Sequence, residues 1–322
     1  MDLRTLGRTD LQISRICFGT MTFGSQMDEA TAHRTLDYCV EQGINFVDTA
    51  NVYNRGLSEE ITGKWLARNR SKVVLATKVF GKMGDAPDDQ GHSRAAIMKA
   101  IDASLKRLQT DHIDLYYLHQ PDWNVPIQET LEAMESLVKA GKVRYPASSN
   151  YAGWQVAEMQ CIASKHNWTP ATVTQPMYNL LARGIEQEYL PMCKHFGIAT
   201  CVYNPLAGGM LTGKQHREKP QPGTRFDNNQ MYLDRYWHPA YFDAVDRLAG
   251  VATKAGRSVI SLSLNWLLHH TPADCVILGA SRLEQLQQNL ATLKDGPLPE
   301  DALAACDDVW RNLRGITPKY NR

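Results

Sequence analysis

Four residues of the chain have side chains that together can polarise a carbonyl group, and each stands at or just beyond the end of a short apolar run. They are Asp48, Tyr53, Lys78 and His119. A nearby ammonium group such as that of Lys78 lowers the pKa of a phenol from its usual value of about 10, and Asp48 would keep this lysine charged and in place. We therefore expect Tyr53 to be a proton donor and His119 to be a second hydrogen-bond donor to the same substrate oxygen.

Each of these residues also has an ordinary structural interpretation. An aspartate at a strand end commonly caps a helix or a turn, and a tyrosine commonly packs at the edge of a core. A lysine is commonly solvated, and a histidine commonly satisfies a structural hydrogen bond. The four residues can form one functional site only if the fold brings the ends of successive strands together.

Short apolar runs alternate with helical patterns along the whole chain. Strands that alternate with helices indicate parallel βαβ units. Eight such units in 322 residues predict an α/β fold, a closed (β/α)8 or TIM barrel, as a single domain over residues 1–322. The predicted strands are 15–20, 45–50, 73–79, 115–120, 143–150, 172–179, 198–205 and 275–280.

Four residues mark expected helix ends between these strands. Ser58, Ser93 and Ser258 each precede a helical pattern and can cap its first turn. Gly141 follows another helical pattern and can take the left-handed position just beyond it.

Two segments are expected to lie outside the barrel pattern. Apolar residues flank a turn at 7–10, which predicts an N-terminal β-hairpin before the barrel begins. The stretch 207–237 has no clear period and is rich in Gly, Pro, Asn and Lys, so it is either a long loop after strand seven that serves as a lid or a segment whose helices or strands the pattern does not reveal.

The composition excludes several classes of protein. The 35 basic and 34 acidic residues nearly balance, so no broad field would attract nucleic acid or an anionic membrane. No stretch approaches the ~18 consecutive apolar residues of a membrane span, and the first residues lack the apolar core of a signal peptide. The seven scattered cysteines form no C-x-x-C pair, so we expect no metal site and no disulfide framework. A reducing cytoplasm fits this cysteine usage.

The barrel prediction gives the polar strand ends a common location. In a parallel barrel the carboxyl ends of all strands lie on one face, where the connecting loops build the active site. Further polar residues end the later strands, namely Ser149, Asn150, Gln175, Tyr203, Asn204, Ser281 and Arg282. Residues far apart in the sequence are therefore expected to line one mouth.

Three segments, in the same order, resemble signatures of the aldo-keto reductase superfamily. They are DTANVYNRGLSEEITG at 48–63, SLKRLQTDHIDLYYLHQPD at 104–122 and VILGASRLEQLQQNL at 276–290. The C-terminal segment and the long loop after strand seven are similar to the bacterial and potassium-channel β-subunit-like branch. The resemblance covers nearly the whole chain.

This resemblance implies an NADPH-dependent enzyme that reduces an aldehyde or ketone to the alcohol. Tyr53 would be the general acid, Asp48 and Lys78 would tune it, and His119 would orient the carbonyl. The residues that the resemblance implies for binding NADPH or NADP+ are Gly19, Thr20, Met21, Asp48, Ser149, Asn150, Gln175, Tyr203, Asn204, Pro205, Leu206, Ala207, Gly208, Gly209, Lys214, Arg225, Gly279, Ser281, Arg282, Gln285, Gln288 and Asn289.

The resemblance also distributes these residues over the cofactor. Ser149, Asn150 and Gln175 would bind the nicotinamide carboxamide, Tyr203 would stack on the ring, and 204–214 would line the pyrophosphate. The adenosine end would lie at 281–289, where Arg282 beside Ser281 favours NADPH over NADH because a guanidinium can make two hydrogen bonds to a 2′-phosphate. A solvated arginine at the start of a helix is the alternative for Arg282.

Two residues depart from the pattern of the family. Pro146 lies within the fifth predicted strand and cannot donate to a sheet ladder, so a bulge or a lost bond is expected there. Asn54 stands where relatives usually have glycine after the catalytic tyrosine, and asparagine tolerates the left-handed backbone that such a turn needs.

Two other functions stay open at this point. The same barrel serves in some relatives as a cofactor-sensing, non-catalytic regulatory subunit of a membrane channel, although His119 completes the catalytic set. A metal-dependent hydrolase would use Asp48, His119 and Asp122, but the sequence lacks the closely spaced histidine pairs of such sites. The walls of a pocket for a small carbonyl substrate could be formed by Met21, Phe23, Phe80, Trp123 and Tyr151, with Tyr232, Tyr236 and Trp237 from the lid. The sequence does not decide between a monomer and a homo-oligomer.

Overall fold

The computed structural model describes residues 1–316 and 321 and divides into two compact units. The first unit comprises Met1–Pro176, Glu188–Cys201 and Asp274–Leu286, and the second comprises Met177–Gln187, Val202–Ala273 and Gln287–Arg322. The expectation of a single domain over residues 1–322 stays a prediction.

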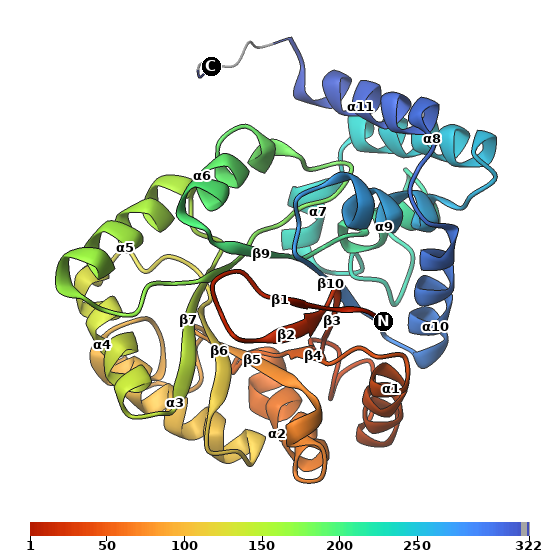
Figure 1. Cartoon of the computed structure of the whole chain (residues 1–322). Helices are drawn as coiled ribbons and strands as arrows, with labels where there is room; N and C mark the ends of the chain where they lie inside the picture. Colours follow the sequence, from red (N-terminus) through yellow and green to blue (C-terminus); the bar gives the residue numbers. More distant parts are fainter. Residues whose placement is uncertain (317–320, 322) are drawn as a thin grey trace. The chain divides into compact units, whose positions relative to one another are not determined.

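Eight parallel strands close into a barrel in the order β10-β3-β4-β5-β6-β7-β8-β9 (Figure 1). All of the strand residues except Val202 belong to the first unit. Each strand overlaps one of the eight predicted runs, and helices connect the strands, so the predicted (β/α)8 barrel is confirmed. The strands are β3 (Ile16–Gly19), β4 (Phe46–Asp48), β5 (Val74–Val79), β6 (Ile113–Leu118), β7 (Val143–Ser149), β8 (Val173–Gln175), β9 (Ala199–Val202) and β10 (Cys275–Gly279).

Burial on both faces explains why the strands read as continuous apolar runs. Every residue of β5 and β6 is buried, as expected for parallel strands covered by helices. In β7 the pairing with β6 stays in step on both sides of Pro146, with Tyr145 opposite Leu115 and Ala147 opposite Tyr117. No bulge forms in this ladder, to which the proline contributes no N–H group.

Six helices of the first unit connect barrel strands, and Figure 1 shows α3, α4 and α5 on the outer side of β5, β6 and β7. Their bounds are α1 (Glu29–Glu41), α2 (Leu57–Leu66), α3 (Arg94–Leu108), α4 (Ile127–Lys139), α5 (Gly153–His166) and α6 (Tyr189–Phe196). Short 3-10 helices occur at η1 (Tyr53–Gly56), η2 (Arg70–Lys72) and η3 (Pro87–Asp89).

The predicted helix ends are mostly confirmed. Ser93 accepts from the N–H of Ala96, Ser258 accepts from the N–H of Ser261, and Gly141 has the left-handed φ of 71°. The prediction that Ser58 caps α2 is wrong, because the helix begins at Leu57 after a left-handed Gly56. The hydroxyl of Ser58 instead donates to the carbonyl of Thr20 at 2.8 Å.

The predicted N-terminal hairpin is confirmed and lies at the amino ends of the barrel strands. Strands β1 (Leu3–Thr5) and β2 (Gln12–Ser14) pair antiparallel. Their turn holds Gly7 with a φ of 53°, where a Cβ atom would lie 2.9 Å from the Cβ of Ala199 at the start of β9. Only glycine fits both this backbone and this close approach.

The second unit is mostly helical. The predicted lid loop 207–237 contains two helical segments, η5 (Ala207–Thr212) and α7 (Gln230–Tyr236), which the absence of a clear period did not predict. The other helices are η4 (Gly184–Glu186), α8 (Pro239–Lys254), α9 (Val259–His270), η6 (Thr292–Asp295) and α11 (Glu300–Arg314), and α10 (Leu283–Ala291) begins in the first unit and ends in the second.

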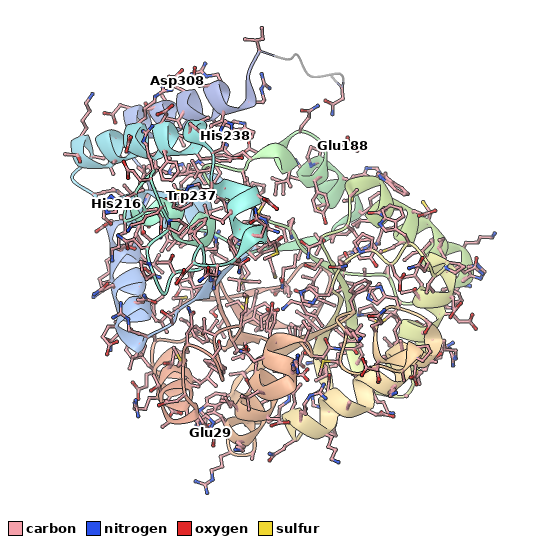
Figure 2. All side chains as sticks on the ribbon, turned by 180° about the vertical axis from the view of Figure 1, so that it is seen from behind. Glu29, Glu188, His216, Trp237, His238 and Asp308 are labelled. Carbon is pink, nitrogen blue, oxygen red and sulfur yellow. The ribbon has the colours of Figure 1, made fainter. Side chains whose placement is uncertain are left out.

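Aromatic packing and several ion pairs stabilise the second unit. The ring of Trp237 lies 5.3 Å from that of Phe226 and 5.0 Å from that of Phe242. Figure 2 labels Trp237, and it labels Asp308 on α11, whose carboxylate accepts from Arg247 of α8 at 2.7 Å. In residues 1–316 and 321, no helix has the length and apolar character that crossing a membrane requires.

Candidate active site

Barrel register brings three of the predicted catalytic residues to neighbouring strand ends. Asp48 is the last residue of β4 and pairs with Gly19 of β3 and Ala76 of β5. Lys78 lies two residues further along β5, and His119 follows the end of β6 directly. The carboxyl ends of parallel strands share one edge of the barrel, which explains how residues so distant in sequence can meet.

Lys78 is the centre of this group. Its ammonium is fully buried and donates to the carboxylate of Asp48 and, at 2.7 Å, to the carbonyl of Thr49. It also donates to the phenolic oxygen of Tyr53 at 3.4 Å. These three acceptors match the three donors of an ammonium group, so the orientation of the lysine is fixed by its partners.

The charge of Lys78 is maintained despite its burial. Burial by itself lowers the pKa of a lysine, but the Asp48 carboxylate and then the neighbouring Tyr53 outweigh it and raise the pKa of Lys78 above its ordinary value. Because Tyr53 accepts a hydrogen bond from this cation, its own hydroxyl proton points away from the lysine. A cation at this distance favours the phenolate that proton donation would leave.

His119 lies beside Tyr53 at the mouth. The two rings are 6.0 Å apart and nearly perpendicular, at 77°. Loss of hydration, followed by the positive charge of Lys78, lowers the pKa of His119 to about 3. The imidazole is therefore neutral at neutral pH and carries a single ring N–H.

The segment after Tyr53 has an unusual backbone. Asn54 and Arg55 both have left-handed φ angles, of 49° and 55°, before Gly56 at 94°. The amide of Asn54 donates to the carbonyl of Phe23 at 2.5 Å and to that of Met21 at 3.2 Å. The asparagine thus tolerates the turn, as predicted, and it also ties the tyrosine loop to the loop that follows β3.

A second polar group adjoins Asp48 from β7 and β8. The amide of Gln175 donates to Oδ2 of Asp48 at 3.0 Å, and Ser149 donates to the carbonyl of Gln175 at 2.9 Å. Asn150 has a left-handed φ of 63° and donates to Ser149 at 3.1 Å and to the carbonyl of His119 at 2.8 Å. These residues, which were predicted to bind a nicotinamide carboxamide, therefore do come together with Asp48.

The donors and acceptors of this group fit a carboxamide ligand. Gln175 is buried, and while its Nε2 donates to Asp48 its Oε1 atom is of the kind that accepts from an amide N–H. Directly after β3, the backbone N–H of Thr20 donates to the carbonyl of Asp48 at 2.9 Å, and Gly19 and exposed Met21 flank it. The hydroxyl of Thr20 lies 2.8 Å from that of Ser58, so it serves the packing of α2.

The residues expected at the adenosine end begin where β10 ends at Gly279. Ser281 donates through both its N–H and its hydroxyl to Oε1 of Gln285, at 2.9 Å each. Arg282 is exposed, and its guanidinium has no hydrogen-bond or ion-pair partner among the described residues. Such a guanidinium is available for an anionic group of a ligand.

The remaining residues expected to bind the cofactor belong to the second unit. Asn204, with a φ of 57°, is buried, and its Nδ2 atom has no hydrogen-bond partner in the part of the chain described. Arg225 donates to the hydroxyl of Tyr232 at 3.3 Å. The complete set in this unit is Tyr203, Asn204, Pro205, Leu206, Ala207, Gly208, Gly209, Lys214, Arg225, Gln288 and Asn289.

Several expected pocket walls are interior residues. Phe23 is fully buried, and Tyr151, Tyr232 and Tyr236 are buried as well. Trp123, four residues beyond His119, is by contrast 77% exposed.

The residues considered for a metal-dependent hydrolase do not form a metal site among the described residues. Asp122 accepts from the N–H of His92 at 2.8 Å and from the N–H of Asn124 at 3.0 Å, so its carboxylate organises a loop. Across residues 1–316 and 321, no three His, Cys, Asp or Glu side chains gather in a way that suits a metal ion.

Comparison with known proteins decides the family. Residues 15–311 match the Aldo/keto reductase family. The chain belongs to this family. It is 37% identical to the "Uncharacterized oxidoreductase YrpG" of Bacillus subtilis (strain 168), over 99% of each chain. It is 38% identical to "Aflatoxin B1 aldehyde reductase member 2" of Rattus norvegicus, over 94% of this chain and 86% of the relative.

Membership in this family makes the protein an oxidoreductase that acts with a nicotinamide cofactor on small carbonyl compounds. A further relative is named "Probable voltage-gated potassium channel subunit beta" of Arabidopsis thaliana, which is 35% identical over 92% of this chain and 93% of its own. These relatives thus carry names of enzymes as well as the name of a channel subunit.

Proposed function

We propose that this aldo/keto reductase uses NADPH to reduce an aldehyde or ketone to the alcohol, with Tyr53 as the general acid. The observation that carries the proposal is the buried ammonium of Lys78, which contacts both the Asp48 carboxylate and the Tyr53 hydroxyl. Such a group has no nucleophile and base of the acyl-transfer type, but it suits proton donation to an oxygen.

The proposed reaction divides between the cofactor and the protein. A bound nicotinamide would supply the hydride to the carbonyl carbon. Tyr53 releases its phenolic proton to the carbonyl oxygen, which becomes the hydroxyl of the product. Lys78 stabilises the phenolate left behind, and Asp48 holds the ammonium in place. A solvent proton then restores the phenol.

His119 has a different part in the proposed reaction. Because its pKa is lowered to about 3, the ring carries no charge at neutral pH. Its N–H would donate to the carbonyl oxygen and stabilise the negative charge that develops there. The phenol and the imidazole would thus approach one oxygen, with only Tyr53 giving up a proton.

Cofactor binding is proposed for the residues of the first unit on the contacts described. Ser149, Asn150 and Gln175 would bind the carboxamide beside Asp48. Arg282 beside Ser281 would pair with the 2′-phosphate that distinguishes NADPH from NADH. The second-unit residues keep the roles that the family resemblance implies.

We propose a cytoplasmic setting from the state of the cysteines. All seven are free thiols, and Cys161 is exposed, which supports the reducing cytoplasm as the location of the enzyme.

The decisive experiment replaces Tyr53 with phenylalanine. Wild type and Tyr53→Phe are compared on a panel of aliphatic and aromatic aldehydes and ketones, with loss of reduced-nicotinamide absorbance as the signal. We expect kcat to fall about 100-fold or more, since only the proton donor has gone, and the Kd for NADPH to stay unchanged. A variant that reduces substrate as fast as wild type shows that another group is the acid.

A second candidate function is a cofactor-sensing regulatory subunit, which the likeness to a relative named as a channel subunit favours. The same panel separates the two candidates. Stoichiometric binding of NADPH by the wild-type protein without turnover of any carbonyl compound supports the subunit.

A further inference from the structure

His92 is a fully buried histidine outside the predicted site, and it joins the loops that follow β5, β6 and β7. Its backbone N–H donates to Asp122 in the loop after β6 at 2.8 Å, and its carbonyl accepts from the hydroxyl of Thr130 at 3.1 Å. Its ring lies 5.2 Å from that of Phe80, at 70°. The position of the imidazole is therefore fixed from several sides.

The hydrogen bonds of the ring determine its tautomer. Nε2 lies 3.0 Å from the carbonyl oxygen of Val79. A carbonyl can only accept, so Nε2 carries the proton. Burial lowers the pKa of His92 below its ordinary value, so the ring is neutral and Nδ1 is an acceptor. The hydroxyl of Tyr151, 3.4 Å away, is then the donor to Nδ1.

The Val79 carbonyl connects His92 with the candidate catalytic residues. Val79 directly follows Lys78, and its carbonyl also accepts from the backbone N–H of His119 at 3.0 Å. The carbonyl of His119 in turn accepts from Asn150, the residue before Tyr151. His92 thus contacts both chain segments that hold the backbone of His119.

We propose that His92 is a positioning residue for carbonyl reduction, and this inference rests on the function proposed above. Its Nε2–H fixes the Val79 carbonyl, which orients the backbone of His119 and hence the imidazole that faces the substrate oxygen. Small displacements of groups at a reacting centre have large effects on rate. The charged and titratable groups around the ring are Asp122, Tyr151 and His119.

Two substitutions separate this role from mere packing. His92→Gln places an amide N–H close to where Nε2 lies and keeps the donor to Val79. His92→Asn is shorter and keeps an acceptor near Nδ1 for Tyr151, but its donor cannot reach Val79. Both variants lose the imidazole ring and its contact with Phe80, so the loss of packing is nearly matched.

We expect His92→Asn to lower kcat about tenfold or more relative to His92→Gln, with the same Kd for NADPH in both variants. Thermal unfolding of both proteins is measured alongside. Equal kcat values in the two variants overturn the proposal, because the bond to Val79 then has no effect on the reaction.

A measurement on the wild-type protein covers the case in which a variant does not fold. Nitrogen NMR of labelled histidine distinguishes the two neutral tautomers, and the proposal requires the Nε2–H form of His92. An Nδ1–H tautomer overturns it. Failure of the reductase function has a separate signature, which is full turnover by Tyr53→Phe.

Discussion

At the scale of single residues, the buried pair of Lys78 and Asp48 supports orientation more than stability. A buried ion pair loses hydration on both sides, and this loss often cancels the attraction between the charges. Here Asp48 accepts from Lys78 through Oδ1 and from Gln175 through Oδ2. The Asp48 carboxylate thus orients both the lysine that contacts Tyr53 and the amide of Gln175 that is expected to contact the cofactor. Its main effect is to position these two side chains.

The lowered pKa of His119 predicts that acid weakens the folded state. The folded pKa is about 3 against an ordinary 6.5, so between these pH values the unfolded chain binds a proton that the folded chain does not. The unfolding free energy therefore falls as pH falls through this window, by up to about 1.4 kcal/mol per pH unit. The pKa of His92 is also lowered, so this residue adds to the loss of stability at low pH.

Urea unfolding at pH 7 and pH 5 checks this prediction. We expect His119 to account for at most about 2 kcal/mol of the loss in wild type, because the residue is not fully buried. His119→Gln should lose less stability over the same interval. An identical pH dependence in the two proteins contradicts the assignment.

Asn54 gives a second prediction at this scale. Asn54→Gly keeps the left-handed backbone but loses the bonds to the carbonyls of Met21 and Phe23, at a cost of about 1 kcal/mol. Asn54→Ala loses the same bonds and adds roughly 1 kcal/mol of backbone strain. Chemical denaturation measures both variants. Equal stability of the two would show that the turn is not strained.

At the scale of elements, hydrophobic pattern is sufficient to find the barrel strands but not every helix. The strands β5 and β6 are buried over their whole length, so their apolar runs are unambiguous. Helix α7 has only 7 residues, too few for a helical period to emerge. Ser58 has the right residue type for a cap, but the helix begins one residue before it, at Leu57 after the left-handed Gly56. The serine is therefore inside the helix, where it is buried.

The candidate site divides in the same way between predictable and unpredictable residues. Asp48, Lys78 and His119 stand at strand ends, so the barrel topology alone gathers them. His92 does not stand at a strand end. The role proposed for it depends on one hydrogen bond from its side chain to the backbone of Val79, 13 residues away. No periodicity in the sequence encodes such a bond, so only the coordinates locate it.

Attachment of α2 to α3 and β5 leads to a prediction about elements. Glu59 of α2 is fully buried and accepts from Arg107 of α3 at 2.7 Å and from Thr77 of β5 at 2.5 Å. Arg107→Met leaves this carboxylate buried without its cation, which costs about 3 kcal/mol or more. Because α2 follows the loop of Tyr53, kcat should fall as well.

A double-mutant cycle checks this prediction. We expect the pair Arg107→Met and Glu59→Gln to be clearly less destabilised than the sum of the single changes, because the second change removes the unpaired charge. Urea midpoints of the four proteins provide the comparison. Strict additivity means that the two side chains do not act as a pair.

At the scale of the whole molecule, cofactor binding should raise the stability of the folded chain. A ligand that binds only the folded state adds about 2.7 kcal/mol when its concentration is 100 times its Kd. The exposed Arg282, which has no ion-pair partner among the described residues, should make this effect larger for NADPH than for NADH. In our proposal this preference depends on a single contact, between the guanidinium of Arg282 and the 2′-phosphate, and the stability of the whole protein would report it.

Thermal unfolding with each cofactor, in wild type and Arg282→Ala, measures this preference. We expect NADPH at saturating concentration to raise the Tm of wild type by several degrees, and NADH at the same concentration to raise it less. Arg282→Ala should bring the NADPH shift down to the NADH shift and leave the NADH shift and the Tm without cofactor unchanged, because the guanidinium has no partner inside the described part of the protein. If the substitution lowers both shifts equally, the arginine contacts a part that the two cofactors share, and the 2′-phosphate is recognised by another residue.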